Sequence, residues 1–149
     1  MKIKFIILGC GSSMGVPRAD GFFGNCDPNN KKNYRTRCSA LIKTSSENIL
    51  IDTSPDLRQQ LLRHKIKKIT KVYYSHMHAD QTHGINDLRS FYINSKKQID
   101  IYADKITTKA LNESFSYCFK NYSKEYPATL KLNKLGKKLI INHENKNIQ

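Results

Sequence analysis

The stretch ITKVYYSHMHAD at residues 69–80 decides the fold prediction, because an apolar run ends there in two histidines and an aspartate. We expect a strand over residues 69–74 whose end carries His76, His78 and Asp80. Where a chain turns out of a sheet, side chains at this spacing can converge on one divalent metal. Imidazole and carboxylate are the usual ligands of zinc and its first-row relatives. The alternative is an accidental pair of surface histidines.

Around this stretch, apolar runs and turn signals alternate in the manner of an α/β layered fold. Residues 9–37, rich in glycine and asparagine, are expected to form a long structured loop. We expect strands at residues 3–8, 38–43, 49–52, 69–74 and 98–102, and a last strand from Leu139. Helices are expected from the N-cap Ser54 to His64, over 84–92, and from Asp104 through Tyr122.

Composition excludes several classes of protein. The 149 residues suffice for one domain and contain no apolar run of the ~18 residues that a membrane span needs. The net charge is +14, but the lysines are scattered, which favours general basicity over a dedicated nucleic-acid surface. The four cysteines form no C-x-x-C pair, which fits a reducing cytoplasm. Three of them, Cys10, Cys38 and Cys118, are expected in the core.

Four segments together resemble the phosphodiesterase branch of the metallo-β-lactamase superfamily, in the family's order and spacing. They are GCGSSMGVPR at 9–18, RCSAL at 37–41, ILIDT at 49–53 and HMHAD at 76–80. The sequence looks like the phosphoribosyl cyclic phosphodiesterase group, with tRNA 3′-processing endonucleases as more distant kin. The resemblance covers residues 1 to about 120. It implies that this chain is the N-terminal half of an αβ/βα sandwich.

The resemblance also implies roles for individual residues. His76 and His78 would hold a first divalent metal, Zn²⁺ or Mn²⁺. Asp80 would ligate or orient a second ion and act catalytically by holding the attacking water. Asp52 would lie beneath the site and fix the histidine turn by hydrogen bonds. An ordinary strand-end turn residue is the alternative for Asp52.

The sequence departs from the family pattern at two places. Gln81 stands where the family usually has a histidine, so it would support the site as a weak, neutral neighbour. His83 would serve as a ligand if the chain turns there, and otherwise as a wall or substrate residue. The further ligands that the family supplies from its later half are not identifiable here. His143 is the only later histidine, and its surroundings are typical of a turn. The strand from Leu139 would need a partner beginning at Ile148, where no room remains. We therefore expect residues 1–149 to be a single domain truncated at its C-terminus.

These features predict a cytoplasmic metal-dependent hydrolase that cleaves a small or cyclic phosphodiester through a metal-bound water. One alternative is a tRNA 3′-processing-type endonuclease, which the basic charge favours and the absence of an inserted tRNA-gripping arm disfavours. Another is a truncated fragment without catalytic activity. A nucleic-acid partner is thus the less favoured choice, one or two metal ions remain open, and the oligomeric state is not predicted.

Overall fold

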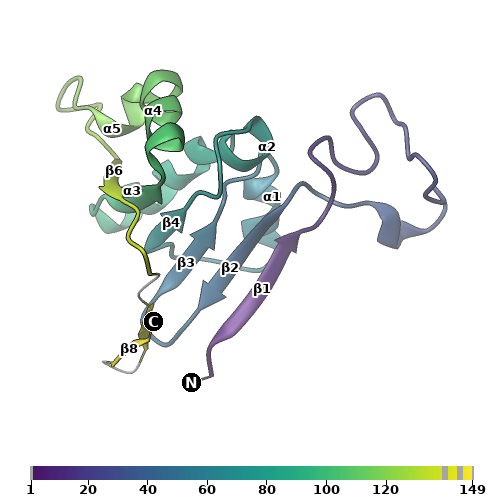
Figure 1. Cartoon of the computed structure of the whole chain (residues 1–149), viewed down its shortest axis with the longest axis horizontal. Coiled ribbons are helices and arrows are strands. Elements are labelled where there is room, and N and C mark those ends of the chain that lie inside the picture. The colour runs from purple at the N-terminus through teal and green to yellow at the C-terminus, as the bar shows by residue number, and fades with distance from the viewer. Residues whose placement is uncertain (1, 139–140, 144–145, 149) are drawn as a thin grey trace.

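A computed structural model describes residues 2–138, 141–143 and 146–148 of the chain. Strands and helices alternate after an N-terminal pair of antiparallel strands (Figure 1). In chain order the elements are β1 (Lys4–Gly9), η1 (Lys31–Asn33), β2 (Ser39–Lys43), β3 (Asn48–Ile51), α1 (Leu57–Arg63), β4 (Lys71–Tyr73), α2 (Ala79–Thr82), η2 (Ile85–Leu88), α3 (Arg89–Ser95), β5 (Ile99–Ala103), α4 (Lys105–Ser114), α5 (Ser116–Phe119), β6 (Leu130–Lys134), β7 (Ile141–His143) and β8 (Lys146–Ile148).

Six strands form one mixed sheet in the order β1-β2-β3-β4-β5-β6. The first three strands pair antiparallel, and β3 to β6 pair parallel. The register aligns one apolar side chain from each strand in a row across the sheet: Ile6, Leu41, Leu50, Val72, Ile101 and Leu132. Because these side chains lie side by side, the short apolar runs of the sequence form strands that share one hydrophobic core.

The helices lie against this apolar row. Leu57 and Leu61 of α1, Ile85 and Leu88 of η2, and Leu111 of α4 belong to the same buried cluster as the row. The loop between β1 and β2 extends away from the sheet (Figure 1). On the opposite face, near the sheet edge, Phe5 and Ile7 of β1 are 65% and 62% exposed. These features confirm the predicted α/β class.

The predicted strands at residues 3–8, 38–43, 49–52, 69–74 and 98–102 are confirmed as β1 to β5 within one or two residues at most ends. Strand β6 was not predicted, because LKLNK has a weak apolar pattern. The start of α4 is as expected, since the Asp104 carboxylate accepts a hydrogen bond from the Thr107 N–H at 2.7 Å. The first helix begins at Leu57 rather than Ser54, whose hydroxyl instead accepts from the Asp56 N–H at 3.0 Å.

Three other expectations need correction. The single helix from Asp104 to Tyr122 is wrong, because Phe115 leaves the helical conformation (φ −129°, ψ 35°) and divides α4 from α5. Cys10 and Cys38 are exposed and not in the core, whereas Cys118 is buried as predicted. The last strand does find a partner, since β7 pairs with β8, and His143 belongs to β7 rather than to a turn. Leu139 itself lies outside the described residues.

Among the described residues, none of the helices combines the length and the apolar character that a membrane crossing requires.

Candidate metal site

Two neighbouring parallel strands deliver the first residues of the site to one edge of the sheet. Asp52 follows β3, and Ser75 and His76 follow β4. Loops at the carboxyl ends of parallel strands are where α/β proteins usually build their sites. Asp52 turns the chain out of the sheet with a φ of 59°, a left-handed conformation that aspartate tolerates better than most residues. Its N–H still donates to the Tyr73 carbonyl at 2.9 Å.

The Asp52 carboxylate clamps Ser75. Oδ1 accepts from the Ser75 N–H and Oδ2 from the Ser75 hydroxyl, each at 2.8 Å. Asp52 is only 7% exposed, and burial raises the pKa of its carboxyl, although both hydrogen bonds from Ser75 oppose that rise. Asp52 therefore reaches the histidine turn as expected, while its role beneath a metal stays a prediction.

The same serine assigns the tautomer of His76. Its one hydroxyl proton is directed at Asp52, so Ser75 Oγ can only accept a hydrogen bond from His76 Nδ1, 3.0 Å away. The proton of a neutral His76 thus lies on Nδ1, and Nε2 carries the lone pair, which accepts a hydrogen bond from His78 Nδ1 in this structure and is the pair that a metal would take. A chain from carboxylate through hydroxyl to imidazole is a common way to orient a metal ligand.

That Nε2 faces the second predicted ligand. His76 Nε2 and His78 Nδ1 are 3.1 Å apart, with the ring centroids at 4.6 Å and the planes nearly perpendicular. Two nitrogens bound to one tetrahedral zinc at ~2.0–2.1 Å would lie about 3.3 Å apart. The pair therefore fits two corners of a single metal, and both rings are exposed to entering ions.

Asp80 and Gln81 form a second pair at the start of α2. The Gln81 amide donates to Asp80 Oδ2 at 2.9 Å. Gln81 is 7% exposed, and within the described part of the chain its Oε1 has no hydrogen-bond partner. The Gln81 carbonyl accepts from the Thr53 N–H at 2.7 Å, which ties α2 to the end of β3. Gln81 thus steadies Asp80 through Oδ2, and among the residues that the structure describes Oδ1 of that carboxylate has no hydrogen-bond partner.

His83 is positioned by Thr82 and Phe115. The Thr82 hydroxyl donates to the His78 carbonyl at 2.9 Å and so accepts from His83 Nδ1 at 3.0 Å. The His83 ring meets Phe115 edge-on, with centroids 5.4 Å apart. Its Nε2 carries the lone pair, but the ring leans toward α5 and not into the pair of His76 and His78.

The glycine loop approaches the site through the backbone. A Cβ on Gly9 would lie 2.1 Å from the Arg37 carbonyl, so only glycine lets these segments pass. The Cys38 thiol, directed at the Gly11 carbonyl at 3.2 Å, also feels the charge of Asp80 and Asp52, and burial is the main reason that its pKa is raised. Cys38, expected in the core, therefore lies between the glycine loop and the site.

The structure brings His76 beside His78, and Asp80 beside Gln81. It does not bring the predicted ligands His76, His78, Asp80 and His83 together around one point. No cluster of three or more His, Cys, Asp or Glu side chains suited to a metal occurs within residues 2–138 or the two described C-terminal stretches. The two imidazole nitrogens are spaced to occupy two coordination positions of one divalent metal ion. Sequence reasoning missed Ser75 and Thr82, the hydroxyls that set the tautomers. Their position directly before a histidine was the available signal.

Residues 47–139 match the family model described as "Beta-lactamase superfamily domain". The chain belongs to the metallo-β-lactamase superfamily.

One curated protein and two solved structures are similar to this chain. An octanoyltransferase of Porphyromonas gingivalis (strain ATCC BAA-308 / W83) is 34% identical over 128 residues, which cover 85% of this chain and 25% of that protein. A crystal structure of a diphosphatase of the PhnP family is similar with a TM-score of 0.76 and 28% identity, over 95% of this chain and 53% of that one. Zn²⁺-bound PqqB of Methylobacterium extorquens shares the fold, with a TM-score of 0.65, 18% identity, and coverage of 94% and 48%. The chain thus spans a quarter of the curated relative and about half of the solved structures.

Proposed function

We propose that this chain is a metal-dependent hydrolase of a small or cyclic phosphodiester, with His76 and His78 as metal ligands. The observation that carries the proposal is the 3.1 Å approach of His76 Nε2 to His78 Nδ1, with the His76 tautomer set by Ser75. Membership of a superfamily of hydrolase-type enzymes supports the reaction class. The likeness to a diphosphatase supports a phosphate ester as the substrate.

A divalent metal, when bound at such a site, lowers the pKa of coordinated water and offsets negative charge on a phosphoryl oxygen. The two histidines would hold it, and Zn²⁺ or Mn²⁺ both accept imidazole nitrogen. Asp52 would act only through Ser75, by keeping the proton of His76 on Nδ1.

We assign proton transfer to Asp80. Its Oδ2 already accepts from Gln81, so Oδ1 is the oxygen that would take the proton of the attacking water. The water oxygen forms the new bond to phosphorus, and one ester P–O bond breaks. The leaving oxygen takes the proton that Asp80 accepted. A linear diester then gives a phosphomonoester and an alcohol, and a cyclic diester opens to one molecule that carries both groups. His83, with its lone pair on Nε2, would contact the substrate rather than the metal.

The test is to express residues 1–149, load the chain with Zn²⁺ or Mn²⁺, and measure both the bound metal by elemental analysis and the hydrolysis of bis(p-nitrophenyl) phosphate. We expect His76→Ala to lower bound metal and turnover together. Asp80→Asn should lower turnover and leave most of the metal bound. The matched control is His64→Ala, since His64 caps the C-terminal end of α1 and makes no contact with the site.

Because the described residues unite only two good ligands, we further propose that this chain holds a single metal ion weakly, since catalytic zinc usually has three protein ligands. Undiminished turnover by His76→Ala would refute the assignment of the ligands. Two tightly bound ions per chain would refute the single weak site.

A further inference from the structure

A second site lies where α3 faces α5 and the loop that follows it. The cavity there measures about 830 Å³ and is lined by residues 85–96 and 117–129. Small-molecule sites usually measure ~300–1,000 Å³, so this cavity has room for one nucleotide-sized ligand. No residue of the candidate metal site lines it.

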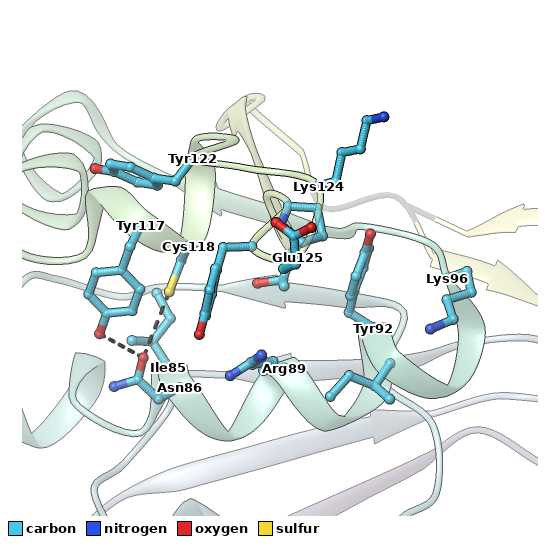
Figure 2. Close-up of a pocket in the computed structure, with 14 residues that line it drawn as sticks. Ile85, Asn86, Arg89, Tyr92, Lys96, Tyr117, Cys118, Tyr122, Lys124 and Glu125 are labelled. Atoms are coloured by element: carbon cyan, nitrogen blue, oxygen red, sulfur yellow. Dashed lines mark hydrogen bonds between the residues drawn. The ribbon is translucent and has the colours of Figure 1, made fainter.

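The floor of the cavity presents a cation beside an aromatic ring. Arg89 and Tyr92 lie three residues apart on α3, and Lys96 is the left-handed residue (φ 56°) that follows the end of this helix. Figure 2 shows the Arg89 guanidinium rising toward the cavity between Asn86 and Tyr92. Among the residues that the structure describes, neither that guanidinium nor the Tyr92 hydroxyl has a hydrogen-bond or ion-pair partner. Both are therefore available to a ligand.

The opposite wall adds further tyrosines and is tied in place. The Tyr117 hydroxyl donates to Asn86 Oδ1 at 2.7 Å, which links α5 to the floor (Figure 2). The Tyr122 N–H donates to the Tyr126 carbonyl at 3.1 Å and closes the loop. Three tyrosines on this wall, which these bonds hold in place, and Tyr92 on the floor offer flat surfaces for a planar ring.

The charge of the cavity favours an anion. Arg89, Lys96 and Lys124 line it against a single carboxylate, Glu125. A hydrogen bond from Ser123 holds the pKa of Glu125 below its usual value, so Glu125 is ionised and can accept from hydroxyl groups. A ligand that suits all three features has a planar ring, a phosphate and sugar hydroxyls.

We propose that this cavity binds a nucleotide, with the base stacked on the tyrosines and the phosphate on Arg89. Stacking on aromatic side chains and pairing of arginine with phosphate are the usual contacts of single nucleotides and unpaired strands. The nucleotide is either free or one unit of a single strand, and the two sources share this chemistry.

The cavity adjoins the candidate metal site. Asn86, which lines the cavity, follows His83 by three residues. Tyr117, which also lines it, follows Phe115 by two residues, and the ring of Phe115 packs edge-on against the His83 ring with the centroids 5.4 Å apart. A nucleotide held here would bring a linked phosphodiester toward His83. That last link rests on the proposed function, whereas binding of the nucleotide requires neither metal nor hydrolysis.

The test measures binding to the full chain in EDTA, by calorimetry with AMP and by fluorescence anisotropy with a labelled eight-residue oligoadenylate. Adenosine and ribose 5-phosphate serve as half-ligands. We expect AMP or the oligonucleotide to bind with a dissociation constant below about 1 mM, and each half-ligand to bind at least about tenfold more weakly than AMP. Tighter binding of the oligonucleotide than of AMP identifies a strand as the source, and the reverse identifies the free nucleotide.

Variants separate this cavity from general basicity. Arg89→Ala and Tyr92→Ala should each weaken binding about tenfold, whereas Tyr92→Phe should stay within about twofold because the ring remains. Arg58→Ala is the matched control, since Arg58 is exposed on α1 and does not line this cavity. His76→Ala should bind as tightly as the parent chain, so loss of hydrolysis and loss of nucleotide binding are distinguishable. The proposal is overturned if neither ligand binds, if Arg58→Ala weakens binding as much as Arg89→Ala, or if ribose 5-phosphate binds as well as AMP.

Discussion

Replacing Asp52 by asparagine should reverse the direction of the hydrogen bonds that hold the proton of His76 on Nδ1. In the parent chain the Ser75 hydroxyl donates to Asp52 Oδ2 and accepts from His76 Nδ1. In Asp52→Asn the new carboxamide keeps one acceptor for the Ser75 N–H but places an NH₂ donor opposite the hydroxyl. The hydroxyl must then turn its proton toward His76 Nδ1, and the proton of the imidazole moves to Nε2.

The effect falls on metal affinity. An imidazole protonated at Nε2 must change tautomer before it can bind a metal through that atom. Loss of such a supporting partner typically costs ~10–100-fold in metal affinity, and we expect a loss in this range for zinc. The fold should survive, because the amide is isosteric and still accepts from the Ser75 N–H, 2.8 Å away in the parent chain.

Two measurements check this prediction. Long-range proton–nitrogen correlation spectra of the metal-free chain report which ring nitrogen of His76 carries the proton. A competitive zinc titration reports the affinity. Asp87→Asn is the control, because the half-buried Asp87 also accepts a backbone hydrogen bond, from the Arg58 N–H, and makes no hydrogen bond to Ser75 or His76 among the described residues. If His76 keeps its proton on Nδ1 in Asp52→Asn, or if zinc affinity stays within about twofold, the tautomer reasoning is wrong.

Three further predictions concern stability and reactivity. Burial would raise the pKa of Glu47, but the Lys71 ammonium at 2.6 Å and the Asn142 N–H hold it lower. The resulting stability is present above the usual pKa of 4.5 and is lost as the pH falls through the folded value. Glu47→Gln should therefore lower the free energy of unfolding by about 2 kcal/mol at pH 7. On acidification below the pKa of Glu47, the free energy of unfolding should fall less in this variant than in the parent chain. Urea titrations at neutral and at acidic pH would show both effects. A Cβ at Gly84 would lie 2.0 Å from the Ser54 carbonyl, so Gly84→Ala should destabilise the fold by about 3 kcal/mol. The control is Gly136→Ala, whose Cβ would lie 3.5 Å from its nearest neighbour and should change stability by less than about 0.5 kcal/mol. Equal effects would contradict the packing argument. Burial raises the pKa of the Cys118 thiol to about 11, so at pH 8 it should alkylate roughly 100-fold more slowly than the exposed Cys26, and comparable labelling by mass spectrometry would count against that burial.

Local patterns were sufficient for most of the fold. The apolar runs that became β1 to β5 are short, and polar residues or glycine stand near most of their ends, so those ends were readable. The patterns failed where neighbours in space decided the outcome. Phe115 fits the helical spacing from Asp104, but it leaves the helix and its ring packs against His83. Cys38 looks apolar in sequence, yet its thiol turns to the Gly11 carbonyl at the surface.

The sequence by itself determined that His76 and His78 come together, because they need only an extended turn after a strand to approach each other. It also determined the α/β class through the alternation of apolar runs and turn signals. Only the tertiary structure decided what surrounds that pair. The Asp52 carboxylate reaches Ser75 across 23 residues because β3 and β4 pair in parallel at one register, and a slip of one residue would point the carboxylate to the other face. The tyrosine-lined cavity likewise exists only because α3 and the segment after α5 pack together, which no local pattern encodes.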